Sequence, residues 1–355
     1  MKRFVRKTLI MTIPLVCLFA YYNLCVSPHM NGDLGRLGMM TFDDGYDTLL
    51  DAAAMDSLYV TEIESLDQID TDSAVLTVGD SFSQQGIYGY QNYLASLFPG
   101  CKVYNLNPEV VSHDQTYQYI LDLIIDNGTL PKYVVMESVE RHLIERLANF
   151  RFSPSGASQR QAAYLDALKN VTPEAPSTLP GGIRAAKDMI RDFRDRILQT
   201  QEYAKKALDI NNPVKHLSLN EDLFSCKGRE HDLYFYRDDL NVPSGEKTQL
   251  ARRKLDSLLH LVGSSDIRFV FLVASNKYHL YRQFSESDPF GASGNLEHFT
   301  TYGGNPYFIN SQELLGKHVA RGEKDIYRCN DTHWNTKAAK YVAEEIKRKL
   351  QEQTR

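Results

Sequence analysis

Short apolar runs and longer amphipathic stretches alternate along the chain from residue 73 onward. The runs AVLTV, KVYNLN, KYVVMES and IRFVFLVA are short and apolar, which is typical of buried strands. The stretches YQNYLASLF, DQTYQYILDLIID and VERHLIERLANF follow the first three runs and have helical character. Strands that alternate with helices predict an α/β fold, in which a parallel sheet lies between two layers of helices.

This alternation is interrupted between about residues 151 and 227. The segments SPSGAS and TPEAPSTLPGG are typical of loops, and IRAAKDMIRDFRDRILQTQEYAKKAL predicts a long charged helix. The regular pattern resumes with a helix near 249–262 and ends with a helix over about 336–350. We therefore expect one domain over 71–355 with a helical insertion. The insertion is a cap over the active face, a docking arm, or a solvated helix with no special role.

The first 27 residues have a different pattern. Four basic residues precede a nearly uncharged run from 9 to 26, which is close to the length that crosses a bilayer as a helix. Pro14 lies within the run and no small-x-small cleavage site follows, so we expect an uncleaved signal-anchor; a cleaved signal peptide is the alternative. Both interpretations place the remaining chain outside the cytoplasm. Residues 28–70 are polar and turn-rich, and we interpret them as a tether that leads into the domain.

Charge and cysteine content narrow the function without defining it. The formal net charge is −5, and no basic stripe interleaved with aromatic residues occurs, which argues against a nucleic-acid partner. Beyond the apolar run lie Cys101, Cys226 and Cys329, an odd number without metal-ligand spacing. At most one disulfide forms among them, and we favour buried free thiols.

The stretch TFDDGY at 41–46 resembles the metal-binding opening motif of polysaccharide deacetylases. A metal site of that kind needs two further histidines from a His-x-x-x-His motif on one helical face. No two of the ten histidines are four positions apart. We therefore interpret Asp43 and Asp44 as turn residues and expect no metal site.

A candidate nucleophile follows the first predicted strand directly. Ligands bind at the carboxyl ends of the strands in parallel α/β sheets, and Gly79, Asp80 and Ser81 stand at that position. Gly79 permits a tight turn, and backbone N–H groups at the start of a helical turn can stabilise an oxyanion next to Ser81. The alternative is that Ser81 only caps the turn.

A second block, NDTHW, stands before the last predicted helix. His333 can accept a proton from a serine only if a partner fixes its tautomer and balances its charge, and Asp331 lies two positions earlier. The alternative is a surface loop in which Asp331 caps a turn. Trp334 is the only tryptophan of the chain and argues for a packed loop, because a tryptophan side chain favours burial.

These two blocks together resemble the SGNH hydrolase superfamily, whose fold is a flavodoxin-like three-layer αβα sandwich. The Asp-Thr-His-Trp form, YVVMESVERHL and SNKYHLY make the chain similar to the alginate O-acetyltransferases and DHHW-type proteins. The resemblance implies that Ser81 is the nucleophile, His333 the general base and Asp331 its orienting partner. One departure is the order of the blocks, because in the alginate enzymes Asp and His precede Ser.

A second departure concerns the oxyanion hole, because the Gly-x-Asn-Asp block of SGNH esterases is absent. Asn105 and Gln115 are the alternative candidates for oxyanion donors. Lys277 and Tyr278 follow a late strand and are candidates for substrate contact, with a position at the sheet edge as the alternative. Asp80, Glu137, Arg141 and Trp334 are expected to support the site, with Glu137 and Arg141 as a structural ion pair.

The resemblance implies a membrane-anchored, extracytoplasmic serine O-acyltransferase that acetylates a hydroxyl of a cell-envelope or secreted glycan. It implies no metal and no dissolved nucleotide cofactor. The expected partners are a glycan acceptor and a multi-pass membrane acyltransferase that delivers the acyl group. Two alternatives stay open at this point: a carbohydrate esterase that uses the same triad with water, and a non-catalytic scaffold of a polysaccharide-modifying complex.

Overall fold

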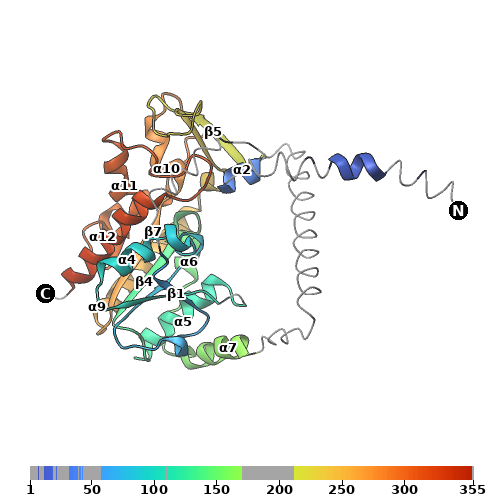
Figure 1. Cartoon of the computed structure of the whole chain (residues 1–355). Coiled ribbons are helices and arrows are strands. Elements are labelled where there is room, and N and C mark those ends of the chain that lie inside the picture. The colour runs from blue at the N-terminus through green and yellow to red at the C-terminus, as the bar shows by residue number, and fades with distance from the viewer. Residues whose placement is uncertain are drawn as a thin grey trace.

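The structure of the protein is a computed structural model, shown in Figure 1. It describes residues 7, 12–18, 21, 32–38, 40, 42, 57–108, 110–169 and 212–353. The long charged helix expected within the insertion lies outside the described residues, and so do Asp43 and Asp44.

The centre of the domain is a six-stranded sheet in which all neighbouring strands are parallel. The strand order is β1-β3-β2-β4-β7-β8. The strands are β1 (Val60–Ile63), β2 (Ala74–Val78), β3 (Lys102–Leu106), β4 (Tyr133–Val139), β7 (Arg268–Ala274) and β8 (Phe308–Asn310). A separate antiparallel hairpin joins β5 (Val214–Ser218) and β6 (Asp232–Tyr236).

Helices cover both faces of this sheet, and each face has its own hydrophobic core (Figure 1). Alternate residues of a strand point to opposite faces, so Val75 belongs to one core and Leu76 to the other. The first face carries α4 (Tyr90–Leu97), α11 (Ser311–Val319) and α12 (Thr336–Glu352). The second carries α5 (His113–Ile125), α6 (Glu140–Asn149) and α9 (Gly245–Gly263). The expected α/β class with a parallel sheet between helical layers is confirmed.

The sequence pattern located the inner strands and missed the edge strands. The runs expected as strands are β2, β3, β4 and β7, which are largely buried and therefore mostly apolar. The strand β1 carries two exposed polar residues between two buried ones, and β8 has only three residues. Neither strand is long enough to give a clear apolar run.

Two parts of the chain differ from their expected organisation. The expected tether contributes β1 to the sheet, and its short helix α2 (Gly32–Gly38) contacts the β5–β6 hairpin. The expected insertion includes α7 (Ala157–Lys169), which packs on α5 through a stack of Tyr119 and Tyr164 with ring centroids 4.1 Å apart. Both segments are therefore built into the domain where the structure describes them.

The predicted signal-anchor lies mostly outside the described residues. Residues 12–18 are described as helical, together with Lys7 and Tyr21. Within the described part of the chain, no helix combines the length and apolar character that crossing a bilayer requires.

A cluster of aromatic rings packs against the loop between α11 and α12. Trp334 is fully buried, and its ring centroid lies 4.6 Å from that of Phe82 and 6.5 Å from that of Tyr90. Trp334 also forms a β-bridge with Tyr327, which is fully buried as well. Because Phe82 directly follows Ser81, this cluster joins the two blocks singled out in the sequence.

We predict that Trp334→Ala lowers the free energy of unfolding by about 3–5 kcal/mol, because it leaves a cavity in a fully buried cluster. Urea unfolding followed by circular dichroism measures this change. Val242→Ala is the control, since Val242 is 59% exposed and its truncation should cost no more than about 0.5 kcal/mol. Equal stability of the Trp334 variant and the parent would contradict the central role of this cluster.

Candidate functional site

Ser81 stands at the tip of a turn that a buried carboxylate holds in place. Asp80 caps the short 3-10 turn Ser81–Ser83, and its carboxylate accepts the N–H of Val139 at 2.8 Å and a guanidinium N–H of Arg146 at 3.1 Å. Burial on its own raises the pKa of Asp80, but Arg146 and the backbone donors lower it below its usual value. The carboxylate therefore stays charged and ties the turn to β4 and α6, while Ser81 is exposed.

The buried side chain of Glu137 holds the same turn through two further hydrogen bonds. Its Oε2 accepts the N–H of Asp80 at 3.1 Å and the hydroxyl of Ser83 at 3.0 Å. Burial and the neighbouring charge of Asp80 raise its pKa well above the usual value. Gly79 has no alternative here, because a Cβ atom would lie 2.0 Å from the Ser83 Oγ and 2.5 Å from the Glu137 Oε2.

The structure brings the three predicted catalytic residues together. The Nε2 of His333 lies 2.8 Å from the Oγ of Ser81. The Nδ1 of the same ring lies 2.7 Å from Oδ1 of Asp331, which also accepts the backbone N–H of His333 at 3.0 Å. This is the chain of contacts that a serine nucleophile, a general base and an orienting carboxylate require.

Asp33 is a second acidic partner of the histidine, and the sequence analysis missed it. Its Oδ2 lies 3.3 Å from His333 Nδ1 and accepts the hydroxyl of Thr332 at 3.2 Å. Its backbone N–H donates to Asp331 Oδ2 at 3.1 Å, and the next N–H, of Leu34, donates to the Asn330 carbonyl at 3.0 Å. No spacing rule could find it, because it lies 298 positions before Asp331 in a segment interpreted as a tether.

The two carboxylates set the charge of the imidazole. Burial lowers the pKa of His333, but hydrogen bonds and charge from Asp33 and Asp331 outweigh burial and raise it from 6.5 to about 9. The pKa of Asp33 is correspondingly lowered, although burial alone would raise it. Since the folded-state pKa of His333 is raised, these contacts stabilise the fold fully below pH 6.5, and the contribution is lost as the pH rises through about 9.

Lys277 lies under the loop that carries Asp331 and His333, and its ammonium group points into the backbone of that loop. Its ammonium donates to the carbonyls of Arg328 at 2.6 Å, Cys329 at 2.9 Å and Asp331 at 3.2 Å. Its side chain is buried, and burial lowers its pKa to about 8. The neighbouring Tyr278 is also buried and donates to Asp288 at 2.6 Å. We therefore correct the expectation that these two residues contact substrate: Lys277 positions the loop.

The two candidates for additional oxyanion donors are engaged elsewhere. The amide of Asn105 is buried and donates to Glu62 at 2.8 Å and to the carbonyl of Ser83 at 2.9 Å. Gln115 closes the capping box of α5, where its Oε1 accepts the N–H of Ser112 at 3.0 Å. Asn105 therefore braces the Ser81 turn, and Gln115 stabilises the start of a helix.

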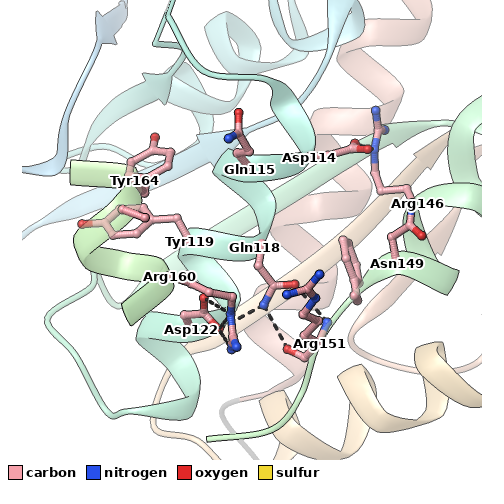
Figure 2. A pocket seen from close by; sticks show the side chains of 12 residues that line it. Asp114, Gln115, Gln118, Tyr119, Asp122, Arg146, Asn149, Arg151, Arg160 and Tyr164 are labelled. Atoms are coloured by element: carbon pink, nitrogen blue, oxygen red, sulfur yellow. Dashed lines mark hydrogen bonds and ion pairs between the residues drawn. The ribbon is translucent and has the colours of Figure 1, made fainter. Parts of the chain in front are cut away.

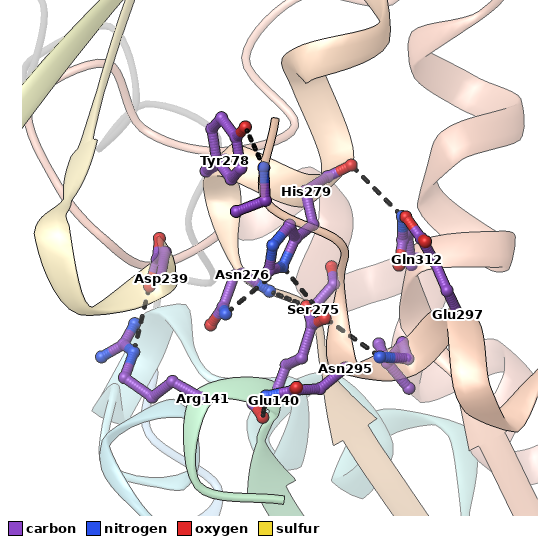
Figure 3. Close-up of polar contacts among 12 residues, drawn as sticks. Glu140, Arg141, Asp239, Ser275, Asn276, Tyr278, His279, Asn295, Glu297 and Gln312 are labelled. Atoms are coloured by element: carbon purple, nitrogen blue, oxygen red, sulfur yellow. Dashed lines mark hydrogen bonds and ion pairs between the residues drawn. The ribbon is translucent and has the colours of Figure 1, made fainter. Parts of the chain in front are cut away.

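The expected ion pair between Glu137 and Arg141 does not form. Arg141 pairs with the buried Asp239 at 3.2 Å, as Figure 3 shows. The acidic residue that supports this region is Glu140, whose carboxylate accepts the N–H of Asn276 at 2.7 Å and contacts His279 Nδ1 at 3.0 Å. Glu140 thereby ties the end of β4 to the end of β7 (Figure 3).

A cleft of about 450 Å³ opens beside Ser81. Its walls come from the Ser81 turn, from the start of α5 and from one side of α6 along its length. His113 and His142 line it without a hydrogen bond or ion pair to the residues that the structure describes, and burial lowers the pKa of both. The cleft therefore presents neutral imidazoles and unused polar groups next to the nucleophile.

The cysteines and acidic residues carry no second centre in the described part of the chain. Cys101 lies at an intermediate depth and Cys226 and Cys329 are buried, and none of the three forms a disulfide within the described residues. The described residues that are close enough to share a metal ion are Asp33, Asp331 and His333, with ligand atoms within 4.8 Å of one another. An ion at His333 Nδ1 would displace the N–H that orients the imidazole in a triad, so we interpret this group as a proton-transfer site.

We predict that Asp33→Asn lowers the pKa of His333 by about one unit or more, because one of its two negative partners is lost. NMR titration of the imidazole measures the shift directly, and the acidic limb of kcat/KM should move to lower pH by the same amount. Asp266→Asn is the matched control, since Asp266 is exposed and remote in sequence from the site. A His333 titration that is unchanged by Asp33→Asn would show that this carboxylate does not act on the imidazole.

The geometry of the site is therefore the basis for assigning a function. Compared with known protein families, with curated proteins and with solved structures, the chain matches none of them.

Proposed function

We propose that the protein is an extracytoplasmic serine O-acyltransferase that transfers an acetyl group to a hydroxyl of a cell-envelope or secreted glycan. The observation that carries the proposal is the unbroken chain of contacts from Ser81 through His333 to Asp331, at 2.8 and 2.7 Å. Its resemblance to the SGNH-type O-acetyltransferases gives the acceptor class. The confirmed α/β class agrees with that type of enzyme.

The chemistry follows from these contacts in two half-reactions. The Oγ of Ser81 attacks the carbonyl carbon of the acyl donor, and its proton passes to His333 Nε2. The tetrahedral intermediate collapses, the leaving group takes that proton, and the acyl group stays on Ser81 as an ester. A sugar hydroxyl then gives its proton to Nε2 and attacks the ester, which leaves an acylated glycan and a free serine.

Each neighbouring group has a defined part in this mechanism. The charge on the imidazolium is balanced by Asp331 and Asp33 together, which stabilises the intermediate states in which His333 holds the proton. The 3-10 turn places the Ser81 N–H beside its own Oγ, where an oxyanion develops. Lys277 keeps the loop of Asp331 fixed through three backbone carbonyls.

The proposed location requires a donor other than a dissolved nucleotide cofactor. Outside the cytoplasm no acetyl-CoA is present, so we propose that a multi-pass membrane acyltransferase delivers the acyl group to Ser81. The first 27 residues are proposed to hold the domain at the membrane surface, with the N-terminus inside.

We predict that Ser81→Ala and His333→Ala each lower acyl turnover by about a thousandfold or more, while Asp331→Asn gives a smaller loss. The double variant should lose little more than either single one, because the triad acts as a unit. The measurement uses purified full-length protein with an aryl acetate, with and without oligosaccharide acceptor. Ser257→Ala, an exposed serine on α9, is the control.

The same assay distinguishes the transferase from the two alternatives, an esterase and a non-catalytic scaffold. A glycan ester that forms only with acceptor supports the transferase, and acetate released regardless of acceptor indicates an esterase. If Ser81→Ala turned over substrate as fast as the parent, Ser81 would not be the nucleophile. If the parent protein showed no turnover at all, a scaffold would be favoured. A chelator should have no effect; loss of activity would reopen a metal-dependent function for Asp43 and Asp44.

We predict that replacing residues 1–26 with a cleavable signal keeps turnover of a soluble aryl ester but reduces acylation of the glycan in cells. Tethering raises the local concentration of the domain near a membrane-bound donor, and the replacement removes that advantage. The acetyl content of the surface polysaccharide measures the effect. Unchanged acetylation, with a secreted domain that is active, would contradict the anchor.

A further inference from the structure

We propose that the acceptor glycan extends from Ser81 into a second binding pocket between α5, α6 and α7, so that the enzyme holds several sugar units of one chain. This inference rests on the proposed transferase function and adds to it the form of the substrate. The second pocket has a volume of about 390 Å³ and is drawn in Figure 2.

The cleft beside Ser81 and the second pocket share a wall. Asp114, Arg146 and Asn149 line both of them. The guanidinium of Arg146 donates to Asp114 at 2.9 Å, and its other contacts fix it to Asp80. Arg146 is only 5% exposed and is held by these contacts, so its side chain forms a fixed boundary between the two pockets. A ligand that extends from Ser81 along the cleft reaches the second pocket by passing over Arg146.

The two helices give this path its direction. On α5, His113 lines the cleft and Asp122 lines the second pocket, and the helix axis advances about 14 Å between them. On α6, the cleft is lined from Arg141 to Asn149, and the second pocket begins at Arg146 and Asn149 near the end of that helix. The path along α5 is therefore longer than one sugar ring and fits a short run of linked sugars, and α6 lines the first part of that path.

The lining of the second pocket is polar but nearly balanced in charge. Arg160 forms three hydrogen bonds to Asp122, so this ion pair is satisfied internally. Tyr119 and Tyr164 lie side by side on α5 and α7 and supply the apolar part of the lining (Figure 2). Sugars combine hydroxyl groups, which donate and accept hydrogen bonds, with apolar C–H faces, and this lining offers partners for both.

Two side chains of this region are unused within the described part of the chain. The amide of Asn149 and the guanidinium of Arg151 are exposed and make no hydrogen bond or ion pair there. An amide and a guanidinium both donate to hydroxyl oxygens, and Asn149 also accepts. They are the groups that we expect to fix the orientation of the glycan between its reacting sugar and its distal end.

The helix α7, at the start of the insertion, has a role in this path. The helix α7 contributes Arg160, Ala163 and Tyr164 to the second pocket. It therefore acts as the outer wall of a glycan path, which develops the expectation that the insertion caps the active face.

Blocking the second pocket tests the proposal. Ala163 is exposed on α7 and lines the pocket, so Ala163→Trp fills it, whereas Ala162→Trp adds the same side chain one position away, outside the lining. Both changes are made in full-length Ser81→Ala protein, which binds without turnover. The probes are fragments of the host's own surface polysaccharide, sized from dimer to octamer, and calorimetry measures their dissociation constants.

We expect the affinity of Ser81→Ala protein to rise with fragment length, and Ala163→Trp to weaken octamer binding at least tenfold while dimer binding is kept. Ala162→Trp should bind every fragment like its parent. Equal octamer binding by the two tryptophan variants, or affinity independent of length, overturns the second pocket. The Ser81-dependent aryl acetate assay is scored separately, so that loss of the pocket with intact turnover leaves the proposed function standing.

Discussion

The hydrogen bond between Ser81 and His333 is the contact on which the site depends, and it joins two loops that are 252 positions apart. Neither loop is held by hydrophobic packing alone. Asp80 fixes the serine turn through Arg146 and Val139, and Lys277 fixes the histidine loop through three carbonyls. The charged side chains of Asp80 and Lys277 are thus buried on either side of the contact between Ser81 and His333. The aromatic cluster around Trp334 fills the space between them.

Buried charges are costly, and the neighbouring groups reduce that cost. Removing an ion from water is unfavourable unless it is paired and hydrogen-bonded. The carboxylate of Asp80 has a cation and two backbone donors, whereas Glu137, which lies beside it, has a pKa raised by burial and by Asp80 itself. A neutral Glu137 avoids placing two negative charges under one turn. Burial and the neighbouring Asp80 thus favour the protonated form of Glu137, while Arg146 favours the charged form of Asp80.

The sequence was sufficient to single out Ser81, Asp331 and His333, which the structure brings together, and to locate the inner sheet, because both depend on local pattern. Ser81 follows an apolar strand at the edge where ligands bind, and Asp331 is near enough to His333 for a loop to join them. Asp33 depends on the packing of α2 against Asn330, which no local pattern encodes. The expected pair of Glu137 with Arg141 failed because the helical four-residue rule does not hold across the boundary between β4 and α6.

Lys277 shows how a correct location still gave an incorrect role. The residue does follow a strand at the ligand-binding edge, as its sequence position indicated. The loop that carries Asp331 turns several carbonyls inward, and buried carbonyls need donors. An ammonium group on a long flexible stem satisfies three of them at once. That demand exists only after the loop has folded, so no local sequence pattern reveals it.

The two carboxylates on His333 impose a compromise between the strength of the base and its availability. A pKa of about 9 means that at pH 7 only about one molecule in a hundred has a neutral imidazole that can accept the serine proton. In the proposed mechanism, the same interactions stabilise the imidazolium that forms after proton transfer from Ser81, and they act where charge develops. Asp33 therefore favours the charged intermediate at the expense of the free base. Because Asp33 belongs to α2, the basicity of His333 depends on how this N-terminal segment docks against the loop.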